Sequence, residues 1–186
     1  MAPWNPDVYS RAWLFATEVH EGQTYGGPRE GPQMPYINHV GEVAAEVMAA
    51  LAATPGLDGD LAVQCALLHD TVEDTSVTLD ELRTRFGDDV AAGVAALTKD
   101  ETLPDKPAKM ADSLARIRRQ PREVWMVKLA DRIVKLSEPP HYWSREKSTL
   151  SQLANLPDEL GHTVFFPVLV LHSVWQSLLG AAGKAP

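Results

Sequence analysis

The stretch Ala66–Thr75 reads ALLHDTVEDT and joins an apolar run to a cluster of ionisable side chains. Apolar residues cover most sides of the helix expected over 61–72, which is typical of a helix in the centre of a protein. A histidine and three acids then follow within the six residues 69–74. Because half-buried carboxylates without a counter-charge are costly, we expect basic side chains or a metal ion to neutralise them.

If the helix continues to residue 74, the spacing of these groups places them in neighbouring pairs. His69 and Glu73 are four residues apart, as are Asp70 and Asp74, and residues at that spacing are neighbours on a helix. Imidazole nitrogen combined with carboxylate oxygen suits manganese, iron or zinc. A His-Asp pair alone is weak evidence for a metal site, because a hydrogen-bonded core histidine followed by an exposed aspartate has the same sequence.

Two more polar residues stand in apolar surroundings. His39 lies near the start of an apolar-striped helix, and Asp131 interrupts the apolar face of another. Each has an ordinary interpretation as a capping or paired polar group. Together with His69 and Asp70 they form a candidate shell of two histidines and two aspartates.

Helical signals dominate the rest of the chain. Asn5-Pro6-Asp7 combines a capping side chain, a proline and a first-turn acid, and Thr78 opens a capping box. The segment 21–35 holds four glycines and three prolines and is expected to be a loop. No alternating run is long enough to indicate a sheet. Further helices are expected from about Asn38, over 61–72, 78–86, 88–98, around 110–117, and over 122–136, 144–155 and 158–180.

Bulk composition sets the class of protein. With 186 residues and 45% hydrophobic content, one all-α domain over 1–186 is expected, with C-terminal helices at 144–180. The net charge of −8 argues against a nucleic-acid partner, and no apolar run reaches the roughly 20 residues of a membrane span. The absence of a signal-peptide pattern and a single cysteine, Cys65, expected in the core, favour a cytoplasmic protein.

Basic residues gather in the second half of the chain. The ordinary interpretation is a solvated helix face, and the alternative is a local positive field for a small phosphorylated ligand. The residues are Arg116, Arg118, Arg119, Arg122, Lys128, Arg132 and Lys135.

The order His39, His69-Asp70, Asp131 resembles that of the HD-domain superfamily of metal-dependent phosphohydrolases. It resembles more closely the RelA/SpoT-type hydrolase domain, whose small stand-alone forms remove the 3′-pyrophosphate of guanosine tetraphosphate (ppGpp). The resemblance covers about residues 8–140 and implies a compact helical bundle with the motifs in that core. The matching stretches are HEGQ at 20–23, PYINH at 35–39, ALLHDTVEDTSVTLDELRTRFGDDV at 66–90, LTKDETLP at 97–104 and PREVWMVKLADR at 121–132.

The resemblance also implies roles for individual residues. Glu73 and Asp74 match the acidic pair that orients the attacking water and transfers protons. Such a role is physically consistent, because a divalent cation acidifies bound water and a nearby carboxylate can deprotonate it. His20 matches a family position but is expected to have a structural role. The residues that would hold one divalent metal, usually manganese in this family, are His39, His69, Asp70 and Asp131.

The chain departs from the family at the positions that read the substrate. An Arg-Lys pair normally follows HxGQ, whereas this chain has Tyr25-Gly26 in a lengthened loop. Tyr25 can stack on a base, and Arg29 can partly replace the missing charge. The Asn and Thr that normally follow LADR are replaced by Lys135 and Glu138. Lys128 is expected close enough to offset negative charge on a phosphate or on the acids.

Three hypotheses follow for the function. The first is a metal-dependent (p)ppGpp 3′-pyrophosphohydrolase. The second is an HD-type phosphohydrolase of another nucleotide, because the substrate-reading residues are replaced. The third is a nucleotide-binding module without turnover, against which the complete set of ligand types and acids argues. All three imply a small nucleotide as the partner and leave the oligomeric state open.

Overall fold

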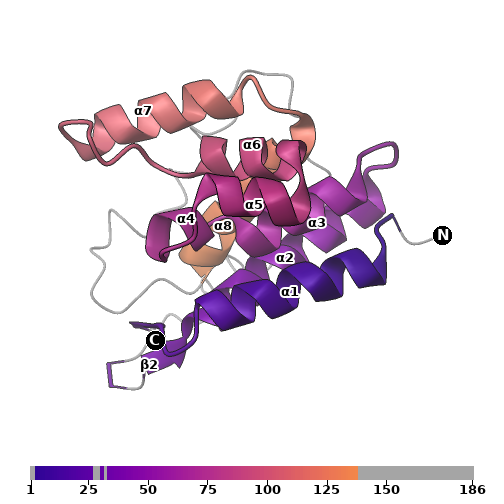
Figure 1. The fold of residues 1–186 in the computed structure, drawn as a ribbon, viewed down its shortest axis with the longest axis horizontal. Helices are drawn as coiled ribbons and strands as arrows, with labels where there is room; N and C mark the ends of the chain where they lie inside the picture. The colour runs from indigo at the N-terminus through magenta and orange to yellow at the C-terminus, as the bar shows by residue number, and fades with distance from the viewer. Residues whose placement is uncertain (1–2, 27–29, 32, 138–186) are drawn as a thin grey trace, which may run out of the picture.

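The computed structural model describes residues 3–26, 30–31 and 33–137. Helices make up nearly all of the regular structure, which confirms the predicted all-α class (Figure 1). The helices predicted at 144–155 and 158–180, and the extent of the domain to residue 186, lie outside the described residues. The elements are α1 (Pro6–Val19), β1 (Thr24–Gly26), β2 (Gln33–Pro35), α2 (Tyr36–Ala53), α3 (Gly59–Leu68), α4 (Thr71–Asp74), α5 (Leu79–Phe86), α6 (Asp88–Leu97), α7 (Lys106–Ile117) and α8 (Arg122–Ser137).

Side-chain caps begin the helices where the sequence predicted them. The Asn5 side chain accepts a hydrogen bond from the backbone N–H of Asp7 at 2.9 Å, and the Thr78 hydroxyl accepts one from Glu81 at 3.2 Å. These bonds satisfy backbone donors that have no partner within a first helical turn. Gly87, with φ of 94°, lies in the left-handed region and lets the chain reverse between α5 and α6.

The central helix is α3, which packs against α1, α2, α6 and α8 (Figure 1). Eight of its ten residues are buried, in agreement with the apolar run on most sides of the predicted helix. Cys65 is among them, and burial raises the pKa of its thiol to about 12, which confirms the predicted core role. The side-by-side packing of α2, α3 and α8 brings together segments from three regions of the sequence.

Two expectations were wrong in detail. The helix expected over 61–72 ends at Leu68, and α4 begins a separate turn at Thr71. The loop expected over 21–35 contains an antiparallel hairpin, in which Tyr25 pairs with Met34. Each strand has only three residues, too few for an alternating pattern to be visible in the sequence.

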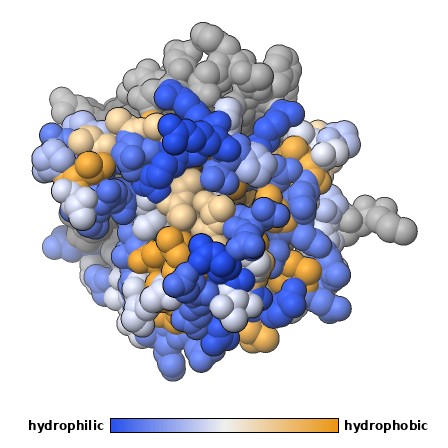
Figure 2. Space-filling model, turned by 45° about the horizontal axis from the view of Figure 1, so that its top comes forward, coloured by the Kyte–Doolittle hydropathy of each residue, from blue (hydrophilic) through white to orange (hydrophobic). Residues whose placement is uncertain are grey.

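The face of the molecule drawn in Figure 2 mixes hydrophilic and apolar residues. In Figure 2 hydrophilic residues cover most of the visible face, and apolar residues reach it in separate patches. Within the part of the chain that the structure describes, no helix combines the length and apolar character needed to cross a bilayer.

Gly93 offers a test of the packing around α3. A Cβ at this position of α6 would lie 2.7 Å from the Cys65 sulfur and 3.0 Å from a Val124 methyl group. We expect Gly93→Ala to lower the free energy of unfolding by about 1–3 kcal/mol through overpacking. Gly41→Ala is the control, because its Cβ would meet only the Trp13 ring at 3.4 Å and should leave stability unchanged or improve it. Urea unfolding measures the free energy of unfolding of both variants. Equal values would contradict the close packing of Gly93 against Cys65 and Val124.

Candidate metal centre

Four predicted ligands converge from three parts of the fold. His39 comes from the first turns of α2, His69 and Asp70 from the break between α3 and α4, and Asp131 from the middle of α8. One donor atom of each lies within 4.8 Å of all the others. The side chains of the four are between 3% and 12% exposed, so the cluster is nearly removed from solvent.

The break between α3 and α4 orients the side chains of His69 and Asp70. His69 still has helical dihedral angles, whereas Asp70, at φ −102° and ψ 0°, leaves the helix. The Thr71 hydroxyl donates to the Leu68 carbonyl at 2.7 Å and stabilises the turn. Glu73 therefore belongs to the separate turn α4, and the continuous helix expected to stack it on His69 is not formed.

The donor atoms face one another. The Nε2 atom of His39 is 3.3 Å from an Asp131 oxygen, and that of His69 is 2.9 Å from an Asp70 oxygen. Burial lowers the pKa of His69, but the charge and hydrogen bond of Asp70 together with the charge of Asp131 raise it by more, so the net shift is upward. Burial disfavours the charged form of Asp70 too, yet His69 and Lys135 hold the pKa of this carboxyl below its usual range.

The residues fit a divalent metal ion. The Nε2 atoms of His39 and His69 and the Oδ1 atom of Asp131 are buried polar atoms without a hydrogen-bond partner, which is costly unless something coordinates them. The Nδ1 atom of His69 is 2.8 Å from the Ala66 carbonyl, so Nδ1–H donates there and the Nε2 lone pair faces the cluster. Two imidazoles and two carboxylates are a donor set suited to manganese, iron or zinc.

A tyrosine that the sequence analysis did not single out supports the cluster. The Tyr36 hydroxyl donates to an Asp70 oxygen at 2.5 Å, and its ring lies 5.5 Å from that of His39. Burial and the Asp70 charge both raise the pKa of Tyr36, so the hydroxyl keeps its proton. The sequence feature that could have pointed to Tyr36 is its place in PYINH. It stands three residues before His39 and therefore lies on the same helix face. His20 is buried beside Tyr36 with Nδ1 2.6 Å from the Gln23 side chain, which confirms its structural role.

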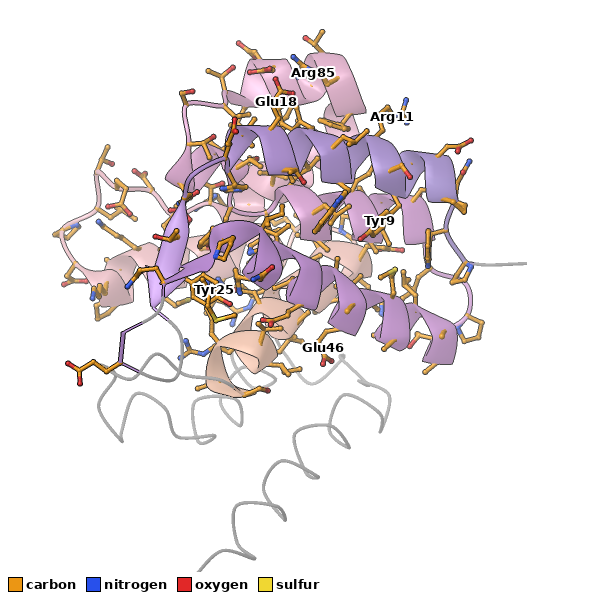
Figure 3. All side chains as sticks on the ribbon, turned by 90° about the horizontal axis from the view of Figure 1, so that it is seen from below. Tyr9, Arg11, Glu18, Tyr25, Glu46 and Arg85 are labelled. Carbon is orange, nitrogen blue, oxygen red and sulfur yellow. The ribbon has the colours of Figure 1, made fainter. Side chains whose placement is uncertain are left out.

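The hairpin brings Tyr25 to the mouth of this cluster. Its ring meets the rings of Tyr36 and His39 edge-on, with centroids 6.0 and 6.2 Å away. Figure 3 shows Tyr25 beside the hairpin at the N-terminal end of α2. The position is compatible with the predicted stacking on a base, which stays a prediction. Arg29 lies outside the described residues.

Two lysines of α8 neutralise the aspartates. The ammonium of Lys135 is 2.6 Å from Asp131 Oδ1 and 4.0 Å from Asp70 Oδ2. Lys128 lies 4.0 Å from the other Asp131 oxygen, and burial lowers the pKa of this lysine. Both residues reach the site, as the sequence analysis expected of Lys128.

The acidic pair lies on α4, beside the cluster. Glu73 is held by Lys99, whose ammonium is 2.5 Å from one carboxylate oxygen and whose backbone N–H donates to the other at 3.2 Å. This contact was not predicted, although Lys99 stands in the matching stretch LTKDETLP. Asp74 is half-buried, and burial together with the Asp70 charge raises its pKa.

Four arginines of the basic row, at positions 116, 118, 119 and 122, form no ion pair with the four donor residues in the part of the chain that the structure describes. Arg116 donates to the carbonyls of Ala95 and Thr98 and pairs with Asp112 at 2.8 Å, so it caps the end of α6. Arg118, Arg119 and Arg122 are exposed. For these arginines the ordinary interpretation of a solvated or capping role holds.

Comparison with known proteins identifies the family. The model of a family described as HD domain matches residues 12–154. The chain belongs to the HD-domain family. The predicted resemblance is thereby confirmed, together with the class of enzyme that it implies, a metal-dependent phosphohydrolase.

Individual relatives of this HD-domain chain cover most of its length. It is 36% identical over 140 residues to the guanosine-3′,5′-bis(diphosphate) 3′-pyrophosphohydrolase MESH1 of Xenopus tropicalis, and equally to that of Homo sapiens. Each alignment spans 72% of both proteins. A solved structure described as a metazoan ortholog of SpoT that hydrolyses ppGpp matches with a TM-score of 0.72 at 24% identity. That match covers 93% of this chain and 96% of the other.

Proposed function

We propose that the protein is a 3′-pyrophosphohydrolase that removes pyrophosphate from guanosine 3′,5′-bis(diphosphate) with the help of one divalent metal ion. The observation that carries the proposal is the buried cluster of four donor side chains, three of whose atoms have no hydrogen-bond partner. The names of the relatives, which are 36% identical over 72% of the chain, support the substrate. The cytoplasm is the proposed location.

His39, His69, Asp70 and Asp131 would hold the metal, which we propose to be Mn²⁺. A divalent ion held there would lower the pKa of a bound water molecule and withdraw charge from a phosphoryl oxygen. Tyr36 and the Ala66 carbonyl orient Asp70 and His69 through the hydrogen bonds described above. These groups hold the donor atoms in place before the reaction begins.

Glu73 and Asp74 are the proposed catalytic acids. Glu73 is 20% exposed at its side chain, so water can reach the carboxylate. Lys99 fixes this group through two contacts, and a carboxylate held in this way can accept a proton from water. Asp74, with its raised pKa, is suited to exchanging that proton with solvent or the leaving group.

The charge balance of the site favours a phosphate-rich ligand. The carboxylates of Asp70, Glu73, Asp74 and Asp131 face the ammonium groups of Lys99, Lys128 and Lys135, as ion pairs or within electrostatic range. With neutral histidines, four negative charges against three positive leave about one negative charge, and a divalent ion reverses the sign. A pyrophosphate group is therefore attracted once the metal is bound. We assign substrate contacts to Tyr25, Arg29, Lys128 and Lys135.

A second candidate function keeps the chemistry and changes the nucleotide. Where the family has Asn after LADR, this chain has Lys135, and its ammonium lies against Asp131 and Asp70. Polar contacts decide which substrate an enzyme accepts, so replacing them shifts the specificity. Another nucleotide substrate is the alternative that this observation favours.

One assay separates these proposals. Metal-stripped protein is incubated with Mn²⁺ and a nucleotide panel that includes ppGpp, and the products are separated by chromatography. We expect GDP and pyrophosphate from ppGpp, and no product in excess EDTA, because the metal supplies the activated water. Turnover of other nucleotides alone would favour the second candidate. Turnover of none would leave a binding module.

A further inference from the structure

We propose that Lys135 is a resident cation of the metal centre, which neutralises Asp131 and Asp70 in the metal-free protein and is displaced from them when the divalent ion binds. The displaced ammonium then becomes available to a phosphate group. The inference rests on the proposed function for the identity of the metal site. It adds that this chain binds metal and phosphate cooperatively.

The first support is the position of the ammonium. It lies 2.6 Å from Asp131 Oδ1, the same atom that is 3.3 Å from His39 Nε2 and 3.8 Å from His69 Nε2. The ammonium and this oxygen form an ion pair. The lysine therefore contacts the donor atom that faces the two unpartnered imidazole nitrogens.

The second support is the fold around the lysine. Lys135 is four residues after Asp131 on α8, so the two side chains lie on the same helix face. A metal ion bound to Asp131 Oδ1 and an ammonium at the same oxygen repel each other strongly in a nearly dry site. Metal binding is therefore weakened by the lysine, since the ion must first displace a favourable contact.

The third support is the contrast with Lys128. Its side chain is 10% exposed, and its ammonium lies 4.0 Å from Asp131 Oδ2, so it is confined. The Lys135 side chain is 33% exposed, so part of it reaches the surface. A charged, partly accessible ammonium beside a metal centre suits a phosphate oxygen.

The test is a Mn²⁺ titration of metal-stripped protein in which the EPR signal of free aqueous Mn²⁺ gives Kd without any turnover. We expect Lys135→Met to bind Mn²⁺ at least about tenfold more tightly than the natural chain. Lys135→Arg, which retains a cation, should stay within about twofold of the natural chain. Lys106→Met is the matched control, because it removes the same charge from an exposed position on α7.

Inorganic phosphate at constant ionic strength provides the second arm. It should tighten Mn²⁺ binding at least about threefold in the natural chain, because phosphate gives the displaced ammonium a partner, and less in Lys135→Met. Lys135→Gln repeats the measurement if the methionine variant does not fold, as judged by circular dichroism.

Each outcome decides a different question. Equal or weaker Mn²⁺ binding in both neutral variants would overturn the proposal for Lys135 and leave the proposed function intact. Tighter Mn²⁺ binding in the variants, together with no turnover of ppGpp by the natural chain, would support the role of Lys135 and overturn the proposed substrate. A natural chain and variants that all fail to bind Mn²⁺ would overturn the proposal together with the choice of metal.

Discussion

Asp131→Asn is expected to abolish tight Mn²⁺ binding and to lower the rate of hydrolysis about 10³-fold or more. Asp131 Oδ1 lies within 3.8 Å of the Nε2 atoms of both histidines, and its carboxylate is the only anionic donor that α8 brings to the described cluster. An amide has the same shape but no charge, so it coordinates weakly and leaves Lys128 and Lys135 without their counter-ion. The metal stabilises the transition state by several kcal/mol, and losing that stabilisation corresponds to a rate loss of about 10³-fold or more.

The matched control is Asp112→Asn. Asp112 also pairs with a basic side chain one helical turn away, Arg116, but its side chain is 39% exposed and belongs to α7. Mn²⁺ binding by calorimetry and the initial rate should stay unchanged in this variant. If Asp131→Asn binds Mn²⁺ as tightly as the natural chain, the assignment of Asp131 as a ligand is wrong.

Glu73→Gln separates catalysis from metal binding. The Glu73 carboxylate lies on α4 and is engaged by Lys99, outside the cluster of four donor atoms. We expect the variant to keep its Mn²⁺ affinity within about threefold and to lose about 10²–10⁴-fold in rate, because a neutral amide cannot accept a proton from water. Steady-state kinetics with saturating Mn²⁺ and calorimetry measure the two effects.

The control for this variant is Glu101→Gln. Glu101 forms a similar pair with Lys109 at 2.5 Å, but its side chain is 71% exposed and is not one of the four clustered donors. Its rate should match that of the natural chain. Full activity of Glu73→Gln would refute the base role, and a parallel loss of Mn²⁺ would make Glu73 a metal ligand instead.

Local patterns in the sequence were sufficient to predict most of the helices and where they begin. The caps at Asn5 and Thr78 and the buried α3 followed from side-chain chemistry and apolar spacing, which act over a few residues. The break after Leu68 was not visible, because its residues are compatible with a helix and Asp70 leaves it only in the folded protein. The hairpin was missed because its strands are too short to give a periodic signal.

The sequence by itself determined the helical class and the types and order of the donor residues, because these depend on local spacing and on the chemistry of each side chain. Only the tertiary structure decided which groups meet. Tyr36 reaches Asp70 across 34 residues and Lys99 reaches Glu73 across 26, through the packing of separate helices. The same packing of α2, α3 and α8 places Lys135 near Asp70, because contacts between distant segments depend on how their helices pack.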